Sequence, residues 1–313
     1  MTSEQAWRTR WCFCHLAAAG YVQMRGSHGS LAMTALSHLL FFDALGAFLV
    51  VAVDISRNFE VWNRSSVRTP FGLERTEVLA GLAMSIILLF MGLDLISHGL
   101  QHALENVGGH ESYHEHHHEK LGAGDIDFSA LLAILVTLFS AYLLGNHARV
   151  SRTMRVSFLE WLPRVARNPS HLLSLSCSFL LLILPLLDLH TYDWFDPALG
   201  FTMAVCMIWL GSGLGYTLGR MLLMSYTDPG VQDVVYGLES DSNITAVDEA
   251  KIWQVHYGLC MANFKLRVRS LDGIEELRKR VTTMVKNRLG GGYGEGSKGV
   301  KWDVNVQIML DRD

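Results

Sequence analysis

A long apolar stretch, Ser30–Asp54, is the feature that most limits how this chain can fold. It contains no Lys, Arg or Glu and is long enough for one α-helix to cross the hydrocarbon core of a bilayer. Asp43 lies near its middle, where a carboxylate facing lipid is costly. The sequence therefore predicts a membrane-spanning helix whose Asp43 faces other helices or a wet cavity. There it binds an ion, relays a proton or hydrogen-bonds to a neighbouring helix.

Further apolar segments predict that residues 1–224 form a bundle of six transmembrane α-helices. Of the 313 residues, 50% are hydrophobic and only 18% are charged, a balance typical of a membrane domain joined to a smaller soluble one. Arginines gather in the connections 55–77 and 146–170, which favours the cytosolic side for both connections and for both termini. The other expected helices are Trp11–Met24, which is short or truncated, Val78–Leu104, Phe128–Leu144, His171–Leu187 and Ala198–Met224.

Histidines and acids follow the third of these helices. Asp94, His98 and His102 recur every four residues and share one helix face, either as a polar stripe leading out of the membrane or as an interfacial edge. The loop 108–120, on the luminal side in this topology, is rich in imidazole and carboxylate, which zinc accepts as ligands. It is either a metal-binding loop or a solvated segment, and its candidate ligands are His110, His114, His116, His117 and His118.

The composition changes at residue 225, and residues 225–313 predict a separate α+β domain. Ile244–Val268 predicts two strands joined at His256-Tyr257-Gly258, and the alternation over 302–310 predicts another strand. A helix is expected near Val231–Leu238, and Asp272 with Glu275 predicts a capping box at the start of a later helix. We expect the glycine-rich segment 290–299 to be a hairpin-like connection.

Other residue types exclude several functions. The five cysteines include no C-x-x-C pair, so neither a disulfide framework nor a cysteine zinc site is implied. The net charge of −4 gives no sign of nucleic-acid binding. The last apolar segment contains small residues spaced for close helix contact, namely Gly211, Gly213, Gly215 and Gly219.

Several segments together resemble the cation diffusion facilitator family of zinc transporters, over most of the chain from Ser30 onward. The matching text is the stretch at Ser30 itself, then FGLERTEVLAG, SHLLSL and DPALG at the starts of the third, fifth and sixth helices, and IWQVHYG in the C-terminal domain. FGLERTEVLAG is the most specific of these. The resemblance implies six membrane helices, a cytosolic ferredoxin-like α+β domain, dimerisation, and exchange of zinc for protons.

The family's transport site pairs an HxxxD motif on the second helix with another on the fifth, and this sequence keeps half of that set. Asp43 and His171 match the motifs, whereas Leu39 and Leu175 replace the other two ligands. His38 lies five residues before Asp43 and so points about 140° away from it on a helix. Protein zinc is almost always held by at least three side chains, so we expect the remnant to bind zinc weakly.

Incomplete ligand sets also occur in family members that pair with a transport-competent subunit, and this sequence is similar to fungal endoplasmic-reticulum subunits of that kind. The resemblance implies a heterodimeric zinc/proton antiporter moving zinc from the cytosol into the endoplasmic reticulum, or alternatively into the Golgi or another secretory compartment. This chain would be its transport-deficient, structural or regulatory subunit, and not an enzyme. Its C-terminal domain, with only His256, Cys260 and scattered acids, is expected to dimerise rather than to sense metal.

Two other functions stay open at the level of sequence. An active homodimeric zinc transporter would use Asp43, His38 and His171 in a rearranged site. A membrane di-iron oxidase or desaturase would use the histidine cluster of the loop 108–120. Such enzymes need several histidine boxes, and the sequence contains one.

Overall fold

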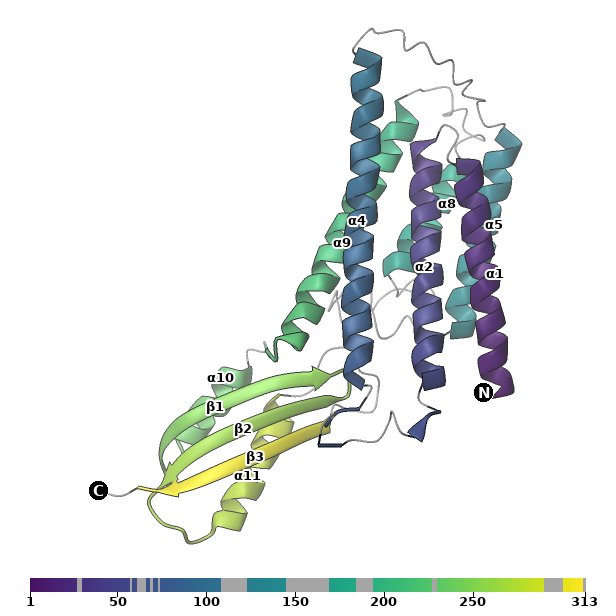
Figure 1. The fold of residues 1–313 in the computed structure, drawn as a ribbon. Coiled ribbons are helices and arrows are strands. Elements are labelled where there is room, and N and C mark those ends of the chain that lie inside the picture. Colours follow the sequence, from purple (N-terminus) through teal and green to yellow (C-terminus); the bar gives the residue numbers. More distant parts are fainter. Residues whose placement is uncertain are drawn as a thin grey trace. The chain divides into compact units, whose positions relative to one another are not determined.

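The computed structural model describes residues 1–26, 30–56, 58–60, 66–67, 70–72, 74–107, 123–144, 169–183, 194–226, 230–289 and 301–311. The chain divides into two compact units. The first comprises Met1–Leu73 and Ala80–Gly215 and is helical, and the second comprises Glu74–Leu79 and Tyr216–Asp313 and contains a β-sheet (Figure 1).

Long helices build the first unit. Helix α1 packs against α2 and α5, and α8 packs against both α2 and α5 (Figure 1). Two of the helices, α4 and α9, also contribute residues to the second unit. The helices and their bounds are α1 Ser3–Gly26, α2 Leu31–Ser56, α4 Glu74–Val107, α5 Ala123–Leu144, α8 Pro169–Ile183 and α9 Phe195–Leu222.

Three of these helices contain segments long and apolar enough to cross a membrane: Leu31–Ser56, Glu74–Gln101 and Phe195–Leu222. Two shorter apolar helices, Phe128–Tyr142 and Pro169–Ile183, accompany them. Each apolar segment that the sequence predicts to be helical overlaps one of the described helices. The prediction for His171–Leu187 is met as far as Ile183, and its last four residues lie outside the described part of the chain.

Helix α1 begins eight residues earlier than the predicted Trp11, because polar residues at its start form a capping box. The backbone N–H of Gln5 donates to Oγ1 of Thr2 at 3.2 Å, and the backbone N–H of Thr2 donates to Oε1 of Gln5 at 3.0 Å. These reciprocal bonds satisfy N–H groups that a helix start otherwise leaves free. An ion pair between Glu4 and Arg8, 2.5 Å apart, supports the same turn.

An acidic side chain from α9 caps the start of α2. Oδ2 of Asp196 accepts the backbone N–H of Leu31 at 2.7 Å, and Oδ1 accepts the hydroxyl of Ser30 at 2.5 Å. A carboxylate at this end of a helix also complements the helix dipole. One charged group therefore joins the first turn of α9 to the first turn of α2.

Small residues let α4 and α9 approach closely, as the glycine spacing predicts for two of the four positions. A Cβ at Gly211 would lie 2.9 Å from Cγ of Leu89, and one at Gly215 would lie 3.2 Å from Oγ of Ser85. A Cβ at Gly219 would meet nothing within 4 Å. Packing thus requires glycine at Gly211, a Cβ at Gly215 would be a tight contact with a side chain, and Gly219 has open space.

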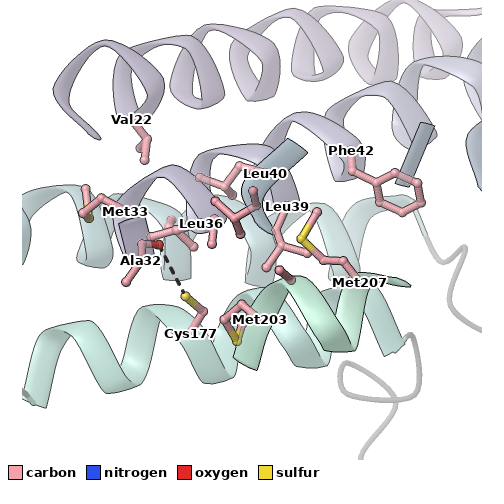
Figure 2. Close-up of a cluster of buried hydrophobic side chains, with 14 of the residues drawn as sticks. Val22, Ala32, Met33, Leu36, Leu39, Leu40, Phe42, Cys177, Met203 and Met207 are labelled. Atoms are coloured by element: carbon pink, nitrogen blue, oxygen red, sulfur yellow. Dashed lines mark hydrogen bonds between the residues drawn. The ribbon is translucent and has the colours of Figure 1, made fainter. Parts of the chain in front are cut away.

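A continuous hydrophobic core fills the first unit. Leu36, Leu39 and Leu40 of α2 are fully buried in it, with Met203 and Met207 of α9 and Cys177 of α8 (Figure 2). The Cys177 thiol lies 3.9 Å from the carbonyl oxygen of Ala32, a contact drawn as the dashed line in Figure 2. Helix α2 is therefore the central element of this core.

The second unit follows an α-β-β-α-β order. Strand β1 pairs antiparallel with β2, and β2 pairs parallel with β3, giving the sheet order β1-β2-β3. Helices α10 and α11 cover one face, where Phe264, Val281 and Val285 are buried (Figure 1). The elements are α10 Gly230–Glu239, β1 Ile244–His256, β2 Leu259–Val268, α11 Ile274–Arg288 and β3 Lys301–Leu310.

The strands around His256-Tyr257-Gly258 and the helix near Val231–Leu238 are confirmed, but one finer prediction is wrong. No side chain caps α11, whose N-cap is Gly273 in a left-handed conformation (φ 73°), while Asp272 accepts the hydroxyl of Ser270. The segment 290–299, which the sequence predicts to be a hairpin-like connection, lies outside the described part of the chain.

Candidate functional site

Asp43 and His171, the two residues that match the transport motifs, meet inside the helical unit. Oδ2 of Asp43 lies 3.1 Å from Nδ1 of His171. Asp43 is 5% exposed and His171 is 6% exposed, so the pair is shielded on nearly all sides. A buried carboxylate is tolerated only with strong hydrogen-bond partners, and the imidazole N–H is one of them.

Hydroxyl groups from α8 complete the surroundings of this carboxylate. Oγ of Ser174 lies 3.1 Å from Oδ2 of Asp43, and Ser170 also hydrogen-bonds to the carboxylate. Both serines are buried. The sequence analysis did not identify them, although they lie four residues apart on the helix that carries His171, a spacing that indicates one polar helix face.

The leucines at the other two ligand positions, Leu39 and Leu175, differ in their surroundings. Leu39 is fully buried in the cluster that contains Met203 and Met207 (Figure 2). Leu175 is half-buried, and it is Ser174 that reaches Asp43 from this part of α8. Neither leucine carries a lone pair with which it could hold a cation.

A third imidazole, which the sequence analysis also missed, lies near the pair. His15 of α1 is fully buried, and neither of its ring nitrogens has a hydrogen-bond partner within the described part of the chain. Asp43 and His171 are ionisable groups in its neighbourhood. A histidine inside the apolar run CFCHLAAAG of the first helix was the signal available in the sequence.

His38 belongs to different electrostatic surroundings. The ionisable groups in its neighbourhood are Asp94 and His98 of α4, whereas those in the neighbourhood of Asp43 are His171 and His15. Nδ1 of His38 is buried and has no hydrogen-bond partner among the described residues. This separation agrees with the helical spacing of five residues between His38 and Asp43. His102 lies in α4, and its side chain is outside the described set.

No three His, Cys, Asp or Glu side chains in the described ranges come together closely enough to form a metal-binding group. The five candidate ligands of the histidine loop, His110, His114, His116, His117 and His118, lie outside those ranges. The loop and its use as a metal site therefore remain predictions from the sequence.

In the second unit, His256 takes part in a contact with the first residue of α4. Nε2 of His256 lies 2.5 Å from Oε2 of Glu74, and Nδ1 accepts the backbone N–H of Gly258 at 3.2 Å. Both ring nitrogens are thus engaged within the unit. Cys260 is fully buried in the sheet core.

Comparison with known proteins adds a family and two relatives. A family model described as the cation efflux transmembrane domain matches residues 16–223. The chain is 27% identical over 254 residues to the "Probable zinc transporter zrg17" of Schizosaccharomyces pombe. This alignment covers 80% of this chain and 62% of that protein. The chain is 22% identical over 286 residues to "Protein ZRG17" of Saccharomyces cerevisiae, covering 87% of this chain and 46% of that protein. The chain thus spans about half to three fifths of the length of these relatives.

Proposed function

Because this chain belongs to the cation efflux family, a class of membrane transporters and not of enzymes, we propose that it is a subunit of a zinc/proton antiporter. The name of the S. pombe relative supports zinc as the cargo. Zinc would move from the cytosol into the endoplasmic reticulum, with the Golgi or another secretory membrane as the alternative. Six transmembrane helices would then leave both termini and a ferredoxin-like domain in the cytosol, in keeping with the arginine-rich connections.

We further propose that this subunit does not carry zinc by itself and works as a heterodimer with a transport-competent family member. The observation that carries this proposal is the two-residue remnant formed by Asp43 and His171. Leu39 and Leu175 provide no ligand atoms, and zinc in proteins is almost always held by at least three side chains. This chain would contribute packing surface and regulation, and its partner would contribute the ion path.

A homodimeric transporter with a rearranged site is the second candidate. It would recruit His38 to Asp43 and His171, and the different charged neighbours of His38 and Asp43 argue against it. The observation in its favour is His15, a third imidazole near the remnant, which is buried and has no hydrogen-bond partner among the residues that the structure describes.

Reconstitution of the full-length chain in vesicles distinguishes these candidates. We expect proton-coupled zinc uptake at the level of empty vesicles when the chain is alone, and uptake above that level when the family member that co-purifies with it is added. Uptake by the pair should survive Asp43→Asn in this chain, because the ion path lies in the partner. Zinc uptake by the chain alone, abolished by Asp43→Asn, would falsify the heterodimer proposal.

A gain-of-function variant provides a second test of the same proposal. Leu39→His combined with Leu175→Asp restores the family's ligand pattern, and we expect this variant to gain uptake without the partner. Leu39→Asn combined with Leu175→Asn adds polar groups without the histidine and carboxylate ligands, and serves as the control.

The histidine loop is proposed to hold zinc on the luminal side, after transport, as a buffer or sensor. Imidazole and carboxylate groups at close spacing in residues 110–119 support this use. Deletion of 110–119 should alter luminal zinc handling by the assembled pair. Unchanged luminal zinc and unchanged assembly in the deletion variant would remove this part of the proposal.

A further inference from the structure

Three polar side chains on successive turns of α8 converge on one carboxylate of α2. His171 and Ser174 both lie 3.1 Å from the same atom, Oδ2 of Asp43, and Ser170 also hydrogen-bonds to the carboxylate. The Asp43 side chain is 2% exposed and that of His171 is 8% exposed. Within the described helical unit, the carboxylate thus has protein donors where an ion would otherwise be needed to offset its burial.

Oδ2 of Asp43, the oxygen that lies 3.1 Å from both His171 and Ser174, is also the oxygen that a cation shared with α8 would need. A donated O–H or N–H and a metal cation compete for the same lone pairs, so Oδ2 cannot fully serve both. The Ser174 hydroxyl has one hydrogen, which serves either Asp43 or the carbonyl oxygen of Ser170 at 3.0 Å. With His171 as a second donor, Oδ2 remains hydrogen-bonded in either orientation.

We propose that Asp43, Ser170, His171 and Ser174 form a metal-independent joint that fixes α2 to α8, with Ser174 as its positioning residue. We call these four residues the Asp43 joint. The inference rests on the proposed function, in which this chain does not carry the ion, and it goes further by giving the former ligands a structural role. In this role the carboxylate is held by hydrogen bonds in place of a metal ion.

Ser178 provides a matched control for Ser174. It is the same residue type, it is also fully buried, and it lies one turn further along the same face of α8. Its hydroxyl donates to the carbonyl oxygen of Ser174 at 2.7 Å, and the structure gives it no bond to Asp43. A difference between Ser174→Ala and Ser178→Ala therefore isolates the bond to the carboxylate from the general effect of removing a buried hydroxyl.

The first measurement is thermal unfolding of the full-length chain in lipid nanodiscs, with and without a zinc chelator. We expect Ser174→Ala to lower Tm by about 2–4 °C relative to Ser178→Ala, the shift for roughly one buried hydrogen bond in a domain of this size. In a variant that lacks residues 110–119, and with them the proposed zinc-holding loop, the chelator should leave Tm unchanged, because a ligand that bound only the folded state would have raised it. Ser174→Thr, which keeps the hydroxyl, should restore the wild-type value.

The second measurement reports on the carboxylate itself. The infrared carboxylate band of Asp43 is assigned by its loss in Asp43→Asn. We expect this band to shift in Ser174→Ala and to stay in place in Ser178→Ala, an effect that a general loss of packing does not produce. If Ser174→Ala fails to fold, Ser174→Cys, whose thiol is a weaker donor, gives the same comparison.

Three results would overturn the Asp43 joint: equal effects of the two alanine variants, an unshifted infrared band, or a Tm of the variant without residues 110–119 that falls when zinc is removed. These results are separate from the test of the proposed function. Zinc uptake by the chain alone, together with a Tm sensitive to Ser174→Ala and insensitive to chelator, would reject the heterodimer proposal and retain the joint. A chelator-sensitive Tm without uptake would reject the joint and retain the heterodimer.

Discussion

Asp43 and His171 form a buried hydrogen-bonded pair in the helical unit, and each polar group offsets part of the cost of burying the other. Replacing one partner by a hydrophobic residue leaves the other buried without its hydrogen bond, at a cost of about 1–3 kcal/mol. We therefore expect Asp43→Leu and His171→Leu each to destabilise the chain by about this amount. The double variant should be closer to the wild type than the two costs added together, because neither polar group remains.

Chemical denaturation of the four proteins of this double-mutant cycle measures the coupling directly. Asp43→Asn is the milder control, because its amide oxygen still accepts a hydrogen bond. Costs that simply add in the double variant would mean that the two side chains do not act on each other.

The residue scale also shows what the sequence could and could not predict. The resemblance to a family motif identified Asp43 and His171, and the structure brings them within 3.1 Å. Ser174 and His15 were missed because serine and histidine in an apolar helix carry no motif of their own. Their importance comes from neighbours on other helices, which spacing within one segment cannot reveal.

At the scale of helices, Gly211 is required by the close approach of α4 and α9. A Cβ there would lie 2.9 Å from Leu89 and 3.0 Å from the carbonyl oxygen of Ser85, and the backbone atom cannot move aside cheaply. We expect Gly211→Ala to cost about 1–3 kcal/mol, the usual range for overpacking, as measured by thermal unfolding. Gly219→Ala is the control on the same helix, with open space around it, and should be neutral or slightly stabilising.

The cap on α2 gives a second prediction at this scale. Asp196→Ala removes an acceptor from the backbone N–H of Leu31 and from the hydroxyl of Ser30, and we expect a loss of about 0.5–2 kcal/mol. Asp196→Asn keeps an acceptor and should lose less. Hydrogen exchange of the first turn of α2, followed by mass spectrometry, should rise in Asp196→Ala more than in Asp196→Asn. Equal exchange in both variants would count against a capping role.

Helix positions were predictable from apolar length, whereas helix ends were not always so. The capping box expected at Asp272 is wrong because Gly273, with its positive φ, turns the chain into α11 instead. The capping box that does form, between Thr2 and Gln5, lies in a polar segment that an apolar pattern ignores. A helix start can be capped by a side chain or formed by a backbone turn, and the sequence pattern does not show which of the two the folded chain adopts.

On the scale of the whole molecule, each unit has its own hydrophobic core, one centred on α2 and one on the sheet. Phe264 is fully buried in the sheet core, and Phe264→Ala is expected to cost about 3–5 kcal/mol there. Hydrogen exchange should increase across β1, β2 and β3 and stay unchanged in α2 and α8, since local stability follows the local core.

Phe201 in α9 is 53% exposed and provides the control, because Phe201→Ala should leave exchange in both cores near the wild-type level. Increased exchange of α2 in Phe264→Ala would mean that the two cores unfold as one cooperative unit. The second unit of the structure includes Tyr216–Asp313, whereas the change in composition lies at residue 225. The change in composition did not predict that the first residues of α4 would be grouped with that unit, because their contacts to it are distant in sequence.

Two carboxylates bond α2 to neighbouring helices at two positions along its length. Asp196 of α9 accepts a hydrogen bond from the first turn of α2, and Asp43, in the middle of α2, hydrogen-bonds to His171 of α8. A transporter exposes its cargo to one side of the membrane and then the other by tilting helices past each other. A tilt of α2 that keeps both contacts would carry α8 and the start of α9 with it, so these two carboxylates couple the movements of three helices.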